Sequence, residues 1–302
     1  MRFYKILIDG KPLFELSNEN PFAPRISFDL KQFEGSEVPN NIISIYNVGI
    51  EFFGVLKKFI GKKFELYAGI KNQTLLNLYG VTEVRNNLIA YGYIAEINAN
   101  PNYSRTENQV FILLRPSAKV LDTPFLLELK AGDNLKDKLK QALQAIYTDC
   151  IVDIGGLSVL AKVTEKIKIL NFAEVQEVAK KNGIAIGRTT KGFLIDDKES
   201  EAIATPRVLK PQDFLEVPSQ IRTSTIQASL MLRGDLTLFS YIEIPKEMFA
   251  TIPLQTNFIL AKPQAYIKGK YRIVKIWHIG DSRNKGAQSW ATNIEAIAIK
   301  ES

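Results

Sequence analysis

The stretch "RTSTIQASLMLRGDLTLFSYIEIP", residues 222–245, alternates apolar and polar side chains until it reaches Arg233-Gly234-Asp235. The apolar positions share one face: Ile226, Ala228, Leu230 and Leu232. Such alternation is typical of an antiparallel strand with one buried side. The tripeptide matches a cell-adhesion sequence, but glycine and aspartate also favour turns. Because nothing in the sequence indicates secretion, we interpret it as a tight turn between two strands.

The alternating pattern divides the chain into three regions. Residues 1–115 consist of short candidate strands and turns, residues 116–200 contain two amphipathic helices and a hairpin, and residues 201–302 return to strands. We therefore predict an α+β fold that is mostly β. In it, two similar antiparallel β-barrel or sandwich domains, 1–115 and 201–302, flank a small α+β domain, 116–200. No low-complexity linker separates the three, so we expect them to pack closely.

Local signals refine this prediction for the first region. Asp9-Gly10 predicts a two-residue hairpin turn, and "EFFGVLKKFIG", residues 51–61, predicts one short helix that ends at Gly61. The strand "LIAYGYIAEIN" is expected to place five residues on one face: Ile89, Tyr91, Tyr93, Ala95 and Ile97.

Capping residues predict the two helices of the middle region. Asp133 is expected to cap the first helix and Asn171 the second, with Gly183 ending the second. The segment "GIAIGRTTKGFLIDD" then predicts two strands around a polar turn at residues 188–191.

Composition restricts the classes of protein that remain. The 302 residues contain one cysteine, Cys150, which is expected in the core, so no internal disulfide forms. We see no signal peptide and no apolar run near the roughly 20 residues of a membrane span, and we predict a soluble protein assembled in a reducing cytoplasm. The net charge is +7, and residues 262–302 hold eight Lys or Arg against three Asp or Glu. A basic segment of this kind meets nucleic acid, an acidic partner or only water.

Enzymatic chemistry finds little support. His278 is the only histidine and ends an apolar strand, where we expect it to hydrogen-bond rather than to act as a base. One His and one Cys cannot supply the usual zinc ligands, and no glycine-rich phosphate loop is present. The candidate carboxylates, Asp196, Asp197, Glu199 and Glu201, fall in an expected polar turn with nothing selecting a pair. We predict no enzyme, no cofactor and no metal, and a hydrolase that uses a carboxylate stays as one alternative.

A nucleic-acid-binding β-barrel is the other alternative. Its candidate stacking platform combines aromatic and basic residues: Tyr91, Tyr93, Tyr103, Arg85 and Arg105. Tyrosines at strand spacing more often pack in a core or under a subunit contact.

The order of the three regions resembles the phage tail baseplate hub family of the late-control protein D type, which is related to the N-terminal part of type VI secretion spike proteins. Three stretches carry the resemblance: "IISIYNVG…IGKKFELYAGI…LYGVTEV", "FAEVQEVAKKNGIAIGRTTKGFLIDD" and "STIQASLMLRGDLTLFSYIEIP…KGKYRIVKIWHIGDSRNKGAQSWATNIEAI". The most specific piece is the closing motif, formed by His278, Gly280, Asp281, Trp290 and Thr292.

The resemblance implies a structural subunit of a tail baseplate in the virion, assembled as a homotrimer whose six β-domains match a sixfold tail tube to a threefold spike. Implied partners are the tail tube or a tube-initiator protein, the central spike, other baseplate proteins and phage DNA in transit. The chain stops soon after the second β-domain, so the spike tip is expected to be a separate protein. With this resemblance, the hydrolase alternative becomes a tail-associated cell-wall hydrolase. Self-assembly is expected to bury an edge strand at "VFILL", residues 110–114. Lys268, Lys270 and Arg272 are predicted to face a partner or the channel, and their reversal to Glu is expected to spare the fold.

Overall fold

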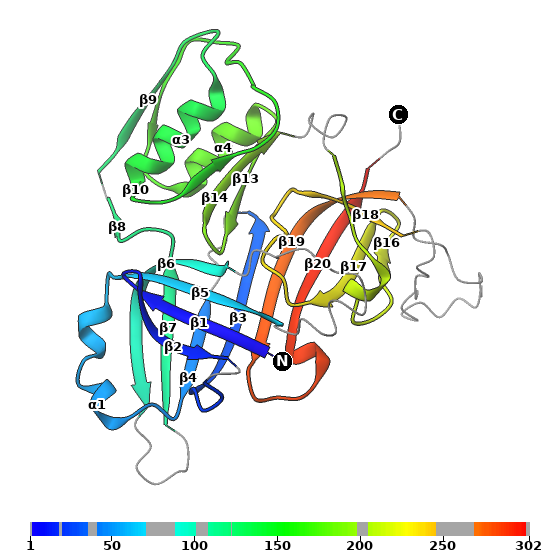
Figure 1. Ribbon diagram of the computed structural model, residues 1–302. Coiled ribbons are helices and arrows are strands. Elements are labelled where there is room, and N and C mark those ends of the chain that lie inside the picture. Colours follow the sequence, from blue (N-terminus) through cyan, green and yellow to red (C-terminus); the bar gives the residue numbers. More distant parts are fainter. Residues whose placement is uncertain are drawn as a thin grey trace, which may run out of the picture.

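The chain forms a mostly β fold with few helices, which confirms the predicted fold class. Its computed structural model describes residues 2–17, 20–35, 41–70, 88–100, 108–121, 123–197, 205–245 and 269–299. Buried apolar side chains gather in three main clusters, each dominated by one of the three regions of the sequence. Figure 1 shows the corresponding units: blue to cyan, green, and yellow to red.

The first β-module comprises the described strands of the blue and cyan unit. They are β1 (Arg2–Ile8), β2 (Lys11–Leu16), β3 (Arg25–Glu34), β4 (Ile42–Tyr46), β5 (Lys63–Ile70), β6 (Leu88–Asn100) and β7 (Gln109–Arg115). They lie in the order β2-β1-β5-β6-β7-β4-β3. The expected hairpin joins β1 to β2, and both turn residues, Asp9 and Gly10, have the positive φ that this turn requires.

The segment between β4 and β5 departs from the single helix expected there. It forms two short pieces, α1 (Ile50–Phe53) and the 3₁₀ turn η1 (Leu56–Phe59). Gly54 separates them, and glycine is a poor helix former. Gly61 follows with a φ of 77°.

The middle unit packs two helices against short strands. The helices are α3 (Leu135–Ile146) and α4 (Phe172–Lys181). The strands are β8 (Lys119–Val120), β9 (Phe125–Leu129), β10 (Tyr147–Thr148), β11 (Val152–Ile154), β12 (Glu165–Ile169), β13 (Ile184–Thr189) and β14 (Gly192–Asp197). Asn171 caps α4 as predicted. The prediction for α3 was wrong by one residue, because Asn134 accepts the bond from the Lys136 amide. Asp133 instead binds the Lys130 amide.

The second β-module comprises the described strands after residue 205. They are β15 (Arg207–Val208), β16 (Ser219–Arg222), β17 (Thr225–Met231), β18 (Tyr241–Ile244), β19 (Gly269–Asp281) and β20 (Trp290–Ala298), with 3₁₀ turns η3 (Pro211–Asp213) and η4 (Ala287–Ser289). The predicted buried face of residues 226–232 is confirmed.

The two β-modules repeat the same strand order. In the first, β3 to β7 lie side by side as β5-β6-β7-β4-β3, and in the second β16 to β20 lie as β18-β19-β20-β17-β16. All of these neighbours are antiparallel. The long strands β6 and β19 are both 13 residues, and each has a register irregularity where it meets the next strand. Five consecutive strands therefore follow one pairing pattern twice.

Two expectations about strand partners were wrong. Residues 110–114 lie in β7, which pairs with β6 on one side and β4 on the other, so this apolar strand is internal to the sheet. The Arg233-Gly234-Asp235 segment does connect two strands, β17 and β18, but the connection is not a tight turn, because it runs from Leu232 to Ser240 and the two strands are separated in the sheet by β20 and β19. Alternation within a strand predicts its buried face but not its neighbours.

The predicted face of β6 was also wrong. Tyr91 and Tyr93 are half-buried, whereas Ala90 before them and Ile94 after them are fully buried. The register between β5 and β6 passes over Ile89, and this irregularity shifts the side-chain parity between Ile89 and Ala90, which no alternation pattern reveals.

Candidate functional site: the seam between the two β-modules

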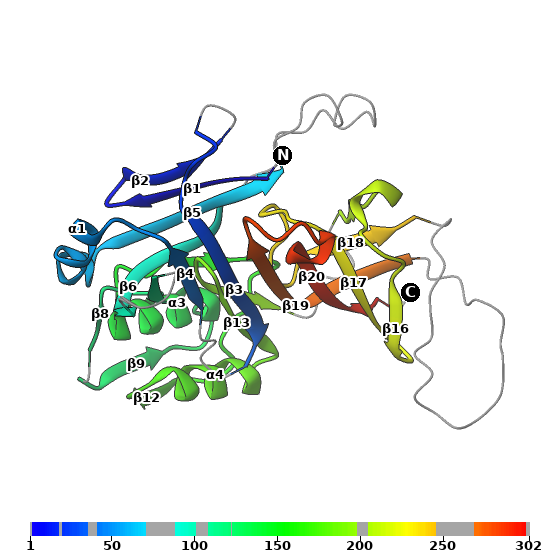
Figure 2. The same cartoon turned by 90° about the horizontal axis from the view of Figure 1, so that it is seen from below.

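The two β-modules are joined by strand pairing, which we call the seam. In the seam, Ser27–Phe33 of β3 pair antiparallel with Lys275–Asp281 of β19. The preceding residues of β19 pair with β18, while β20 lies along its other side. Figures 1 and 2 show β3 beside β19, so that the sheet passes from one module into the other.

A buried hydrogen-bond network crosses the seam at His278. Its Nδ1 lies 3.0 Å from Thr292 Oγ1, and its Nε2 lies 3.2 Å from Gln32 Nε2. Because the Thr292 hydroxyl donates to the Arg233 carbonyl, the network assigns the ring proton to Nδ1 and leaves Nε2 to accept from Gln32. The Gln32 amide also reaches Thr190 in the middle unit, at 3.2 Å. One network thus connects both β-modules and the middle unit.

His278 is held neutral by its surroundings. Burial, reinforced by the charge of Lys191, lowers its pKa to about 3. A base with this pKa takes up protons poorly at neutral pH. The expected hydrogen-bonding role is confirmed, although the residue sits within β19 rather than in a loop.

Aromatic packing fills the seam beside this network. Gly280 lies opposite Phe28 in the register, and a Cβ at Gly280 would come within 2.1 Å of the Phe28 ring. Phe28 packs on Trp290 at 5.3 Å between centroids. The Trp290 indole donates to the Gly69 carbonyl at 2.9 Å, which ties β20 to β5. Only a glycine leaves room for this arrangement.

An ion pair closes the end of the seam. Arg25 donates to both carboxylate oxygens of Asp281, at 3.1 and 2.8 Å. Burial alone would raise the pKa of Asp281, but the bonds from Arg25 and from two backbone amides hold it below its usual value. Arg2 also donates to the Asp281 carbonyl at 2.7 Å. Every residue of the closing motif quoted from the sequence therefore lies at or beside the seam.

A second contact joins the middle unit to the second module. Arg272 is buried and pairs with Asp196 at 3.0 Å, with its guanidinium 4.5 Å from the Phe239 ring centroid. Asp197 is buried against Lys136. These carboxylates lie in β14 rather than in a polar turn, and each has its own cation. Arg272 is thus engaged within the chain, which corrects the expectation that it faces a partner or the channel.

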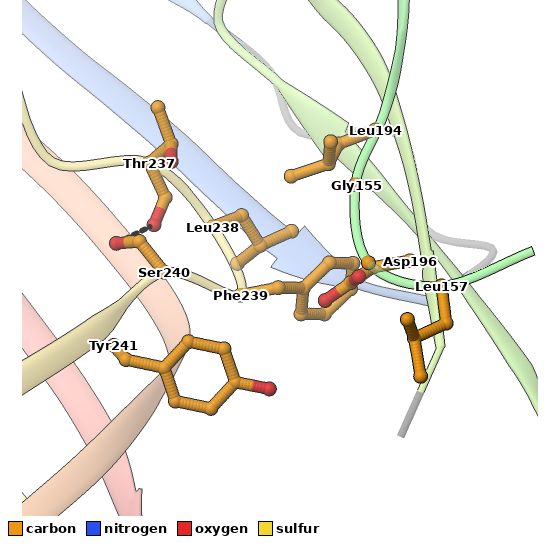
Figure 3. Close-up of a pocket in the computed structure, with 10 residues that line it drawn as sticks. Gly155, Leu157, Leu194, Asp196, Thr237, Leu238, Phe239, Ser240 and Tyr241 are labelled. Atoms are coloured by element: carbon orange, nitrogen blue, oxygen red, sulfur yellow. Dashed lines mark hydrogen bonds between the residues drawn. The ribbon is translucent and has the colours of Figure 1, made fainter. Parts of the chain in front are cut away.

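A cavity of about 390 Å³ opens beside this contact (Figure 3). Its lining is mostly apolar and comes from the middle unit and from the connection before β18. The lining side chains include Leu157, Leu194, Leu238, Phe239 and Tyr241, with Asp196 at one wall. The arrangement offers an apolar recess and no paired acid and base.

The Arg233-Gly234-Asp235 segment is an internal ion cluster. Arg233 is 2% exposed and donates to both oxygens of Asp235 at 2.7 Å, and it also reaches Asp213 at 3.2 Å. Arg207 approaches the same Asp235 carboxylate at 2.6 Å. The arginine is therefore not available to a receptor on another cell.

The remaining candidate residues fall into two groups. Lys270 is exposed at the start of β19, and Tyr91 stacks under the Lys63 ammonium at 4.8 Å. Outside the described residues lie Arg85, Tyr103, Arg105, Glu199, Glu201 and Lys268. The proposed stacking platform is thus not assembled in the part of the chain that the structure describes.

Cys150 is buried as expected, and burial raises the pKa of its thiol to about 11. Across the described ranges, no three His, Cys, Asp or Glu side chains gather as a metal would require. Among the described helices, none has the length and apolar character needed to cross a membrane.

Comparisons with solved structures match this architecture over nearly the whole chain. A tail protein from Neisseria meningitidis aligns with a TM-score of 0.56 at 10% identity, covering 98% of this chain and 96% of its own. The 43 kDa tail protein of prophage MuSo2 from Shewanella oneidensis gives 0.56 at 8% identity, covering 99% and 98%. The chain shares its fold with phage tail proteins.

A component of the type VI secretion system from E. coli, itself described as structurally similar to two T4 tail proteins, gives 0.50 at 8% identity. It covers 92% of this chain and 74% of its own. No protein-family model and no curated protein sequence matches the chain. The likeness to phage tail and type VI secretion proteins is therefore one of fold, and the suspected resemblance is supported at that level.

Proposed function

We propose that the chain is a structural hub subunit of a phage tail or a prophage-derived injection machine. The observation that carries the proposal is the repeated strand order in β3–β7 and β16–β20. The two repeats are joined at the seam, where β3 of the first pairs with β19 of the second. A chain with two such modules supplies six of them as a trimer. It then meets a sixfold tube on one side and a threefold spike on the other.

The site chemistry agrees with a structural role. His278 is neutral and fully hydrogen-bonded, and the carboxylates Asp196 and Asp197 are each paired with a separate cation. The fold matches are a tail protein, a prophage tail protein and a secretion-system component. We propose partners accordingly: the tail tube or its initiator, the central spike, other baseplate proteins, and phage DNA passing through the ring. Residues 1–115 and 201–302 are the proposed ring-forming units, in virions assembled in the host cytoplasm.

Labelled tail particles test the proposal. The chain, produced with a small affinity tag in its native particle, is expected at the spike end of the tail tube when imaged by cryo-electron microscopy. Its absence from purified particles contradicts the proposal. Oligonucleotide binding that weakens steeply with salt would instead favour the nucleic-acid alternative, and lytic activity in a zymogram would favour the hydrolase.

A further inference from the structure

The seam defines which edges of a β-module join to each other. It pairs β3, the last strand of the first module's sheet, with the second half of β19, on the side of β19 that β18 leaves open. In the repeated strand order, β3 corresponds to β16 and β19 corresponds to β6. The equivalent joint would therefore combine β16 with the second half of β6.

The strand registers fix the correspondence residue by residue. A row of paired residues crosses each module: Asp29, Ile42, Leu113 and Glu96 in the first, and Ser219, Gln227, Glu295 and Lys275 in the second. In each row, the residue of the long strand, Glu96 in β6 or Lys275 in β19, comes directly after that strand's register irregularity. Residues 96–100 of β6 thus match residues 275–279 of β19, which are the residues that bind β3.

Both strands of this equivalent joint have an open edge. Within the described residues, positions 96–100 of β6 pair with β7 only, and Glu96, Asn98, Ala99 and Asn100 are exposed. In the same part of the chain, β16 pairs with β17 only. Ile221 and Arg222 in β16 are exposed. Unpaired strand edges are templates for another strand.

We infer that β16 of one chain pairs with residues 97–100 of β6 in a second copy of this chain, antiparallel, as β3 pairs with β19 within the chain. This inference rests on the proposed function, whose ring it specifies. Transferring the seam register, in which Asp29 faces Ile279 and Leu30 faces His278, places Ser219 opposite Asn100 and Gln220 opposite Ala99.

Such a contact joins different surfaces of the two copies, so it closes only by rotation. If each joint, like the seam, turns by one sixth of a full rotation, six modules from three chains close a ring. Charge also favours the pairing. The register of β16 passes over Ile221, so exposed Arg222 takes the row of Lys31 and falls opposite Asn98 of the other copy, diagonal to exposed Glu96 on the same face. Opposite charges across strands stabilise a pair by roughly 0.2–1 kcal/mol.

Cysteine cross-linking tests the register. The full chain has one native cysteine, Cys150, whose burial and raised pKa of about 11 keep it unreactive. The double variant Gln220→Cys with Ala99→Cys is expected to form covalent dimers and trimers under mild oxidation, seen on non-reducing gels. The matched control is Gln220→Cys with Glu96→Cys. Its thiols are three residues out of register, about 10 Å apart along the strand and on opposite faces, and should not link.

The mass of the untreated protein separates the two claims. A trimer that links through 99 and 220 but not through 96 and 220 supports both the ring and this joint. A trimer that links through neither pair, or equally through both, overturns the joint and leaves the ring standing. A chain that stays monomeric and unlinked at every concentration overturns both.

Discussion

A Cβ added to Gly280 would lie 2.1 Å from Cζ of Phe28, closer than any two carbon atoms pack in a protein. The contact lies in the seam, where Phe28 also packs on Trp290. The seam thus has no spare volume at this point. Substitutions there report on how firmly the two β-modules are joined.

Gly280→Ala is expected to lower the free energy of unfolding by about 1–3 kcal/mol, the usual cost of overpacking a well-filled core. Chemical denaturation measures it. Gly286→Ala is the matched control in the adjoining connection, since its nearest neighbour would be the Asn284 side chain at 3.4 Å. Equal stability of the two variants would contradict a tightly packed seam.

His278 predicts a specific pH dependence of stability. Its pKa falls to about 3 in the folded chain, from a usual value near 6.5, because burial disfavours the charged ring. Between these values the unfolded chain binds the extra proton, so stability is present above pH 6.5 and declines as the pH falls, by up to about 1.4 kcal/mol per pH unit.

His278→Gln keeps hydrogen-bonding groups but removes the titration. The difference in unfolding free energy between the parent chain and this variant is expected to change between pH 6.5 and 5, where carboxylates titrate little. Parallel pH profiles for the two proteins would show that His278 is not held neutral.

Arg233 is expected to matter for the fold and not for adhesion. Arg233→Met leaves Asp213 and Asp235 without their shared buried cation and should cost about 3–5 kcal/mol in unfolding free energy. Arg207→Met is the control, because Arg207 approaches the same Asp235 carboxylate from a half-exposed position and should cost about 1 kcal/mol or less. If the two substitutions cost the same, the buried cluster does not stabilise the fold.

Arg272 and Lys270 should respond differently to charge reversal. Arg272→Glu places a carboxylate beside buried Asp196 and is expected to prevent folding, seen as loss of the cooperative unfolding transition. Lys270→Glu changes an exposed residue and should leave unfolding unaltered while lowering particle infectivity, if this end of β19 meets an acidic partner or the channel. Normal infectivity of folded Lys270→Glu would remove Lys270 from that role.

Charge exchange offers a further check on contact between copies. Arg222→Glu should repel Glu96 of the neighbouring copy and raise the dissociation constant of the assembly about 2- to 5-fold at low salt, measured by analytical ultracentrifugation. Adding Glu96→Arg in the same chain restores opposite charges and should recover assembly. A double variant weaker than Arg222→Glu alone would contradict the pairing.

Local sequence patterns predicted some of these features and not others. The alternation through Ile226 and Leu230, the turn at Asp9-Gly10 and the cap at Asn171 follow from interactions within a few residues, so the sequence shows them directly. The closing motif, which includes His278 and Asp281, carried the resemblance to the baseplate hub family in the sequence. Only the structure shows that this motif lies at the seam.

These local patterns did not predict contacts between residues that are distant in the sequence. The pairing of β3 with β19 joins residues that are 242 to 254 positions apart, and no alternation specifies a strand's neighbour. For the same reason Arg272 was expected to face a partner or the channel. The sequence shows its charge, but it does not show that Asp196, in another unit, pairs with it.

The proposal requires the ring built by the repeated strand order, and native mass spectrometry of the purified full-length protein tests it most directly. Three chains of 34.0 kDa give a complex of about 102 kDa, and that species should carry threefold symmetry with six similar modules in electron-microscopy class averages. A protein that remains at the mass of one chain at all concentrations, or forms a ring of any other number of chains, would contradict the account.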